Sequence, residues 1–107
     1  MQELLVYMTT ENSSQAETIG RALVENRLAA CVNILGGMRS LYWWDDKVQS
    51  DNETVLLAKT TDNNLDALTS LVKELHTYDV PCIVALPITG GNPDFLSWIQ
   101  KETAGRG

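Results

Sequence analysis

The stretch SLYWWDDK, residues 40–47, decides the fold because it joins an aromatic strand to a turn. Asp45-Asp46 is the turn candidate, since Asp side chains favour turns, and a return strand is expected from residue 47 to about residue 60. In the other direction the strand pattern extends back to Ala30, interrupted by Gly36-Gly37. Two glycines inside a strand predict a β-bulge or a sharp bend. Each arm of this hairpin approaches roughly twice the usual strand length of about 5–6 residues.

The rest of the sequence alternates between strand and helix patterns. The expected elements are, in order, a strand at 4–8, a helix capped by Ser13 or Ser14 and ending near Arg27, the long hairpin, a helix capped by Thr61 together with Asn64, or by Asn63, and ending near His76, a strand at 80–87, and a C-terminal helix capped by Asn92. This order predicts a ferredoxin-like α+β fold, β-α-β-β-α-β, with one antiparallel sheet and helices on one face. The chain length fits a single domain, 1–107.

The tip of the hairpin carries a large aromatic load. Tyr42, Trp43 and Trp44 extend past the two shorter strands that could support them, and an isolated two-stranded hairpin is only marginally stable in water. An exposed aromatic strand is also an aggregation hazard. We therefore expect other copies of the chain to cover the hairpin. The alternative is a hairpin that folds back over its own sheet.

The charge balance narrows the class of partner. Fourteen acidic side chains against eight basic ones give a net charge of −6, which argues against nucleic acid or an anionic membrane as the partner. No apolar run reaches the roughly 20 residues of a membrane helix, and Met1-Gln2-Glu3 lacks the basic start of a signal peptide. We expect a cytoplasmic protein, ordered nearly throughout, with fraying at residues 104–107.

The cysteines and the single histidine are the chemically distinctive residues. In the expected strand order 4-1-3-2, Cys31 and Cys82 lie at opposite edges, roughly 14 Å apart, whereas a disulfide needs Cα atoms within about 7 Å. Unpaired, inert thiols are therefore expected. His76 has two interpretations, a metal ligand or acid–base group, and a structural residue whose ring bonds carbonyls at the end of a helix.

Several dispersed motifs resemble the CutA family of divalent-cation-tolerance proteins. They cover nearly the whole chain, from Leu4 to about Glu102, and several of them in the right order are more specific than any single match. The motifs are AACVNI at 29–34, SLYWWDDK at 40–47, KTT at 59–61, HTYDVP at 76–81, ALPI at 85–88 and GNPDFLSW at 91–98.

The resemblance implies a ferredoxin-like subunit in a tightly packed homotrimer, with strands of the long hairpin pairing between subunits. It implies an architecture similar to the PII signalling proteins, which bind small ligands between subunits. It also implies a link to tolerance of copper and other divalent cations, without catalytic activity. We therefore expect a homotrimeric cytosolic protein, not an enzyme, that responds to copper or another divalent cation by binding it. A PII-like sensor of a small metabolite and a trimeric interaction scaffold are the alternatives.

The resemblance also implies where a metal would bind. A cysteine and two adjacent histidines are the family's proposed copper ligands, and they match Met8, Leu75 and His76. His76 keeps the ligand type, Met8 offers a soft thioether that suits Cu(I), and Leu75 offers no donor atom. Cys82 is a further candidate, because it follows His76 by six residues near one end of the sheet.

The same motifs contain polar and aromatic residues with a shared expectation, that they line a ligand cleft or the trimer interface. They are Tyr42, Trp44, Lys47, Glu53, Lys59 and Tyr78. In the cleft interpretation their side chains converge on a ligand between subunits, and Lys47 and Lys59 favour a small anion or metabolite. In the interface interpretation the aromatic side chains anchor the contact and Glu–Lys pairs close it.

Overall fold

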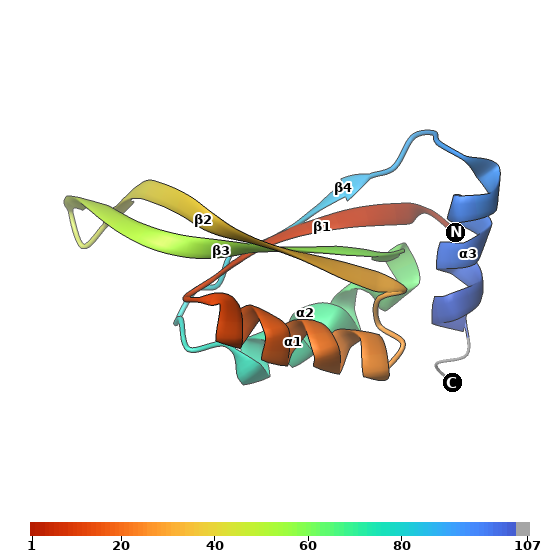
Figure 1. The fold of residues 1–107 in the computed structure, drawn as a ribbon, viewed down its shortest axis with the longest axis horizontal. Coiled ribbons are helices and arrows are strands. Elements are labelled where there is room, and N and C mark those ends of the chain that lie inside the picture. The colour runs from red at the N-terminus through yellow and green to blue at the C-terminus, as the bar shows by residue number, and fades with distance from the viewer. Residues whose placement is uncertain (105–107) are drawn as a thin grey trace.

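A four-stranded antiparallel sheet carries two helices on one face, and a third helix lies at one end of the sheet (Figure 1). The computed structural model describes residues 1–104, so the expected fraying at 104–107 lies outside it except for Ala104. The elements are β1 (Glu3–Thr10), α1 (Ser13–Glu25), β2 (Cys31–Trp44), β3 (Lys47–Thr61), the 3₁₀ helix η1 (Asp62–Asn64), α2 (Leu65–Leu75), β4 (Ile83–Pro87) and α3 (Pro93–Ala104). Their order confirms the ferredoxin-like α+β fold with an added C-terminal helix.

The sheet order is β2-β3-β1-β4, as expected, and its strands differ greatly in length. β2 has 14 residues and β3 has 15, whereas β1 has 8 and β4 has 5. β1 ends at Thr10, which pairs with Thr54 of β3. Beyond this point the sheet narrows to the β2–β3 ribbon, which projects to one side of the molecule (Figure 1). The long hairpin predicted from the sequence is therefore confirmed.

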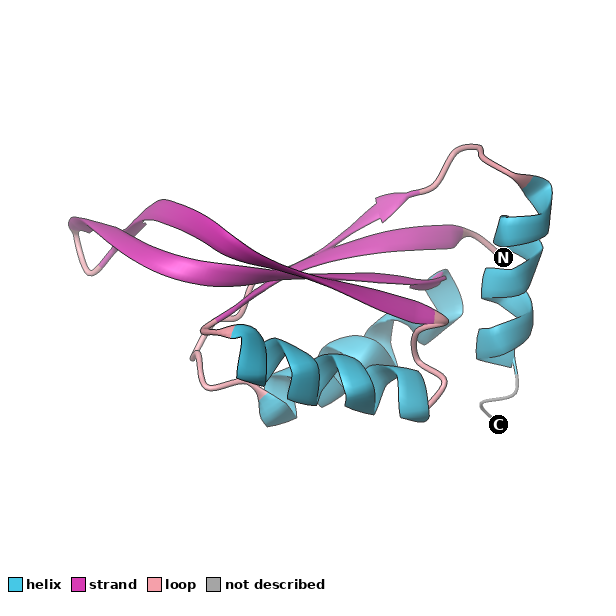
Figure 2. Ribbon diagram, in the orientation of Figure 1, coloured by secondary structure: helices cyan, strands magenta, loops and turns pink. Residues whose placement is uncertain are grey.

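The hydrophobic core lies between the sheet and the helices α1 and α2 (Figure 2). Successive side chains of a strand point to opposite faces, and in β1 Val6 and Met8 point to the helices and are fully buried. Leu23 of α1 and Val72 of α2 pack against them in one cluster. The helix α1 lies so close to the sheet that a Cβ atom on Gly20 would come within 2.9 Å of the side chain of Val32.

The opposite face of the sheet has no helix layer over it (Figure 2). Tyr7 of β1 points to this open face because its neighbours Val6 and Met8 point to the core. Val84 and Leu86 of β4 pair with β1 at Tyr7 and Leu5, so their side chains share the open face. Both are apolar, and 49% and 50% of their surfaces are exposed. One chain thus leaves apolar sheet surface uncovered.

A β-bulge interrupts β2, as the glycine pair predicted. Leu35 pairs with Val55 and Met38 pairs with Glu53, so β2 contains one residue more than β3 between these pairs. Gly37 has a φ of 80°, a left-handed conformation that costs a residue with a Cβ atom free energy. At the far end of the hairpin, Asp45 and Asp46 both have positive φ, 56° and 59°, which is typical of a tight type I′ turn.

Three expected element ends are wrong. Asn12, and not Ser13 or Ser14, caps α1, because its backbone is extended and its Oδ1 accepts a hydrogen bond from the backbone N–H of Gln15 at 2.8 Å. The strand β4 begins at Ile83 rather than at residue 80, since its pairing with β1 starts there; Pro81 has no N–H to give to a ladder.

The third wrong element end is the start of α2. The 3₁₀ helix η1 lies between β3 and α2, and no side chain caps α2. Instead Asn64 Nδ2 donates to Thr61 Oγ1 at 2.9 Å, and Thr61 Oγ1 donates to Asn63 Oδ1. By contrast Asn92 caps α3 as expected, with its Oδ1 accepting from the N–H of Asp94 at 3.0 Å. No helix in the described part of the chain is long and apolar enough to cross a membrane.

The bulge yields a prediction with a matched control. Gly37→Ala should lower the free energy of unfolding by about 1–2 kcal/mol, because alanine resists the left-handed backbone. Gly36→Ala should change it by less than about 0.5 kcal/mol, since its φ is not positive and the nearest atom to an added Cβ is 3.7 Å away. Urea unfolding of both variants at equal protein concentration measures the difference. Equal losses would contradict the assigned backbone at Gly37.

A candidate ligand pocket on the open face

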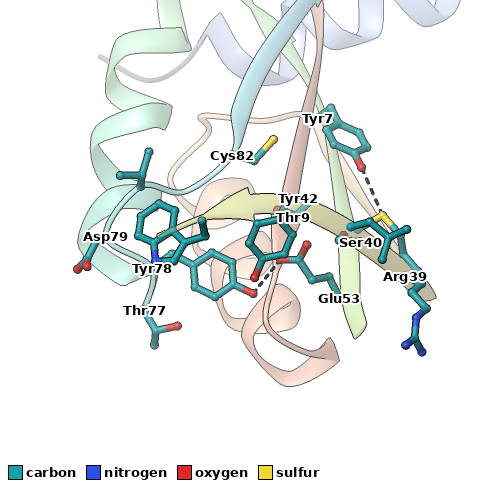
Figure 3. A pocket seen from close by; sticks show the side chains of 14 residues that line it. Tyr7, Thr9, Arg39, Ser40, Tyr42, Glu53, Thr77, Tyr78, Asp79 and Cys82 are labelled. Atoms are coloured by element: carbon teal, nitrogen blue, oxygen red, sulfur yellow. Dashed lines mark hydrogen bonds between the residues drawn. The ribbon is translucent and has the colours of Figure 1, made fainter. Parts of the chain in front are cut away.

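A pocket of about 760 Å³ lies where β1 ends, between the β2–β3 ribbon and the segment that follows α2 (Figure 3). Its lining comes from four parts of the chain: Tyr7 and Thr9 of β1, residues 38–42 and Trp44 of β2, Glu53 of β3, and residues 77–80 with Cys82. The bulge determines which β2 side chains face this pocket. Met38 pairs with Glu53, so Met38, Ser40 and Tyr42 point to the face that Glu53 occupies.

Glu53 is a buried carboxylate without a cationic partner among residues 1–104. It is the first β3 residue beyond the reach of β1, and only 9% of its surface is exposed. Its Oε2 accepts a hydrogen bond from the hydroxyl of Tyr78 at 2.8 Å. The ion pairs within residues 1–104 join Arg21 to Glu17 and Arg27 to Glu102. A neutral hydroxyl is therefore the group that compensates Glu53 for the loss of water.

The two tyrosine hydroxyls beside Glu53 both donate to carboxylates. Burial and the hydrogen bond to Glu53 raise the pKa of Tyr78 well above its usual value. The hydrogen bond to Asp51 raises the pKa of Tyr42 as well. Both phenols therefore stay protonated at neutral pH, and both donate their proton to a carboxylate. Figure 3 shows the bond from Tyr78 to Glu53.

His76 has both ring nitrogens in hydrogen bonds. Its Nδ1 accepts from the backbone N–H of Tyr78 at 3.1 Å, and its Nε2 lies 2.9 Å from the carbonyl oxygen of Thr9. An acceptor Nδ1 requires that Nε2 carry the proton and donate it. The ring also packs on Tyr78, with centroids 4.5 Å apart. This geometry matches the structural interpretation of His76, and a metal would reach the ring only by replacing one of these bonds.

The other metal candidates lie on different faces. Met8 is fully buried in the core on the helix side, whereas Cys82 lines the pocket on the open face. Burial and the nearby charge of Glu53 raise the pKa of the Cys82 thiol, partly offset by a hydrogen bond with the side chain of Thr9. Neither Cys82 nor Cys31 forms a disulfide. Within residues 1–104 no three His, Cys, Asp or Glu side chains form a metal-binding group.

The six motif residues expected in a cleft divide between the pocket and the rest of the surface. Four of them line the pocket or bond into it: Tyr42, Trp44, Glu53 and Tyr78. Lys47 begins β3 at the hairpin turn, and Lys59 lies at the other end of the sheet, where its Nζ donates to Asn33 Oδ1. The cationic members of the set are therefore absent from the pocket lining.

Some pocket residues were not anticipated from the sequence. Tyr7 and Thr9 could have been found from alternation, since they interleave with the apolar residues of the core face. Met38 could not, because its direction depends on how many residues the bulge inserts. Its sulfur accepts a hydrogen bond from the Tyr7 hydroxyl at 3.3 Å, and that contact joins β1 to the ribbon.

The fold and the pocket together define a class: a ferredoxin-like subunit whose open sheet face carries an acidic and aromatic pocket. The comparison of sequences then identifies the family. Residues 4–102 match the family described as CutA1 divalent ion tolerance protein, and the chain belongs to that family.

Relatives and solved structures agree with this assignment. The divalent-cation tolerance protein CutA of Thermus thermophilus is 48% identical over 101 residues, which cover 94% of this chain and 98% of that protein. The rice protein CutA 1, named as chloroplastic, is 46% identical over 100 residues, 94% of this chain, but the match spans only 56% of the rice protein. The crystal structure of rice CutA1 superposes with a TM-score of 0.93 at 45% identity, covering 96% of this chain and 94% of that one.

A structure from Archaeoglobus fulgidus, named as a periplasmic divalent cation tolerance protein, gives a TM-score of 0.91 at 36% identity. It covers 94% of this chain and 98% of that one. The names of these relatives thus place them in different compartments.

The two tyrosine–carboxylate pairs give a matched prediction. Tyr78→Phe should lower the free energy of unfolding by about 1–3 kcal/mol, because it leaves the buried carboxylate of Glu53 without a donor. Tyr42→Phe removes the same hydroxyl beside Asp51, which is exposed, so water can replace it and the loss should be clearly smaller than for Tyr78→Phe. Urea unfolding at pH 7 provides the comparison. A Tyr78→Phe variant as stable as Tyr42→Phe would show that Glu53 does not depend on this hydroxyl.

Proposed function

We propose that this chain forms a cytosolic homotrimer that takes part in tolerance of divalent metal ions, copper among them, by binding the metal, and that it is not an enzyme. The observation that carries the proposal is the uncovered apolar surface of the single chain. Leu41, Trp43 and Val48 at the end of the ribbon are 71%, 75% and 63% exposed. Surface of this kind marks an interface between proteins.

The partner in that interface is another copy of the chain. The ribbon beyond Thr54 has no third strand beside it, and β2 is an edge strand with unpaired backbone groups along its outer side. A second copy can supply both the missing strand and the cover for Val84 and Leu86. The number of copies, three, is the expectation carried over from the family resemblance.

Metal binding in this proposal involves the side of the pocket near Thr9. The carbonyl of Thr9 bonds to His76, and Thr9 and Cys82 both line the pocket, so the two candidate metal ligands both lie near this residue. A thiolate and an imidazole suit copper. Two donors are too few for a closed site, and no larger group exists within residues 1–104. The remaining ligands would come from water or from neighbouring copies.

The cytosolic and non-enzymatic parts of the proposal rest on the cysteines. Cys31 and Cys82 are unpaired and belong to opposite edges of the sheet, which fits a reducing compartment. The raised pKa of Cys82 keeps its thiol protonated at neutral pH, and the protonated form is a poor nucleophile. A second candidate function is small-metabolite sensing, which the pocket supports, because 760 Å³ lies within the range of small-molecule sites, about 300–1,000 Å³.

The assembly can be tested by light scattering coupled to gel filtration. The protein should elute with three times the 11.8 kDa mass of one chain. Trp43→Asp, at the exposed end of the ribbon, should shift the mass toward that of one chain, because it places a charge in a desolvated contact. Val24→Asp, an equally drastic change on the helix side, should leave the mass unchanged. A wild-type protein of single-chain mass would refute the homotrimer.

The metal proposal can be tested by anaerobic titration calorimetry with Cu(I). Cys82→Ser should weaken binding at least tenfold, whereas the matched Cys31→Ser should not. Binding should strengthen between pH 7 and pH 9, because the metal needs the thiolate and the pKa of Cys82 is raised. His76→Ala reports whether the ring joins the site. If both cysteine variants bind like the wild type, Cys82 is not a ligand.

A further inference from the structure

We propose that the pocket on the open face binds a small organic ammonium ion, with its nitrogen at Glu53 and its apolar body against the aromatic walls. The juxtaposition that carries this proposal is a buried carboxylate, unpaired by any cation of residues 1–104, in a pocket that three aromatic side chains also line. The inference deepens the second candidate function, small-molecule sensing, and rests on it. It requires no metal.

The first step concerns the charge of Glu53. Its Oε2 is bonded to Tyr78, and among the described residues no hydrogen bond to its Oε1 is found. Every fully buried side-chain oxygen among residues 1–104 has a hydrogen-bond partner. Because Oε1 has none, it is not fully buried, and it is open to the pocket that Glu53 lines. A carboxylate that is mostly removed from water and lacks a cation is stabilised by a ligand that brings one. A primary ammonium can donate a hydrogen bond to this free oxygen.

The second step concerns the aromatic walls. Tyr42, Trp44 and Tyr78 all line the pocket, and the faces of aromatic rings attract cations that come within about 6 Å of the ring centroid. The hydroxyls of Tyr42 and Tyr78 already donate to Asp51 and Glu53. They are therefore unavailable as donors to an anionic ligand, whereas their rings remain able to contact a cation.

The third step excludes a negatively charged ligand. Asp79 and Arg39, which carry opposite charges, both line the pocket, and the carboxylate of Asp79 points away from Glu53 (Figure 3). Arg39 pairs with Asn52 and its guanidinium points away from Glu53 (Figure 3). Lys47 and Lys59, which had suggested an anion, do not line the pocket. Glu53 is therefore the charged group of residues 1–104 that faces into the pocket, which disfavours a carboxylate or phosphate ligand.

The fourth step concerns the body of the ligand. Besides the aromatic rings, apolar side chains contribute to the lining, Met38, Leu41 and Val80 among them. A metal ion or ammonium itself would leave this surface and most of the 760 Å³ to water. An alkyl or aryl group attached to the nitrogen would bury it instead, and burial of apolar area contributes to affinity. The expected ligand is thus an amphipathic amine.

A charge series of matched probes tests the proposal by titration calorimetry in the presence of EDTA, which removes metal. The probes are 2-phenylethylamine, 2-phenylethanol and phenylacetate, which share a phenyl group and differ in charge. The amine should bind at least tenfold more tightly than the alcohol, and phenylacetate should give no detectable heat. Glu53→Gln should reduce the affinity for the amine at least tenfold, to that of the alcohol. Glu74→Gln, an exposed residue of α2 outside the pocket, should leave it unchanged.

A second variant guards against a folding defect in Glu53→Gln. Trp44→Leu removes one aromatic wall of the pocket, and it should weaken amine binding while light scattering still gives the oligomer mass of the wild type. Tighter binding of phenylacetate than of the amine would overturn the ammonium inference while leaving small-molecule sensing in place. If none of the three probes binds, both fail. A Glu53→Gln change that alters the oligomer mass without any amine binding would mean that a neighbouring copy fills the pocket, which also overturns the inference.

Discussion

β2 has one residue more than β3 between Leu35 and Met38. Every β2 side chain beyond this bulge therefore lies on the face opposite to the one that uninterrupted alternation would give it. Before the bulge the odd-numbered residues of β2 share the open face, and after it the even-numbered ones do. This single insertion places Ser40, Tyr42 and Trp44 on the same side as Tyr7 and Glu53. Without it the same aromatic residues would point to the helix side, and the pocket would lose one of its walls. The backbone of Gly37 is left-handed at the insertion, and a glycine adopts this conformation at little cost in free energy because it has no Cβ atom.

The second constraint is the set of contacts that shields the carboxylate of Glu53 from water. β1 stops one residue short of it, so the carboxylate is shielded from one side by the segment that follows α2. His76 fixes that segment, because one ring nitrogen bonds to Thr9 of β1 and the other to the backbone of Tyr78. Tyr78 in turn donates its hydroxyl to Glu53. The lone histidine therefore acts on the pocket through Tyr78.

Local pattern was sufficient to predict much of this architecture. The strand order, the long hairpin, the Gly36-Gly37 bulge and the separation of Cys31 from Cys82 all follow from periodicity and from turn residues. The cap of α1 was misassigned because Asn12, Ser13 and Ser14 are all good cap residues, and only the backbone decides among them. The start of β4 was misplaced because the apolar pattern of residues 80–87 does not show where the pairing with β1 begins, and Pro81 cannot donate to a ladder.

The composition of the pocket was harder to predict, because it depends on register between distant strands. Tyr42 and Tyr78 are 36 positions apart in the sequence, yet both bond to carboxylates of β3. Lys59 also belongs to one of the family motifs, but it lies at the other end of the sheet. The resemblance grouped these residues by their occurrence in motifs, whereas the structure separates the acidic and aromatic members from the two lysines. For the small-metabolite alternative, that separation changes the proposed ligand from an anion to an organic cation.

The central claim is that the ribbon beyond Thr54 is built to be covered by other copies of the chain. Hydrogen exchange of the backbone amides of residues 40–44 tests it most directly, since in one chain the outer edge of β2 has no partner. The account predicts that the amides pointing away from β3 exchange as slowly as those of β1, and that this protection is lost in the Trp43→Asp variant. Rapid exchange at these amides in the wild-type protein, with β1 still protected, would contradict it.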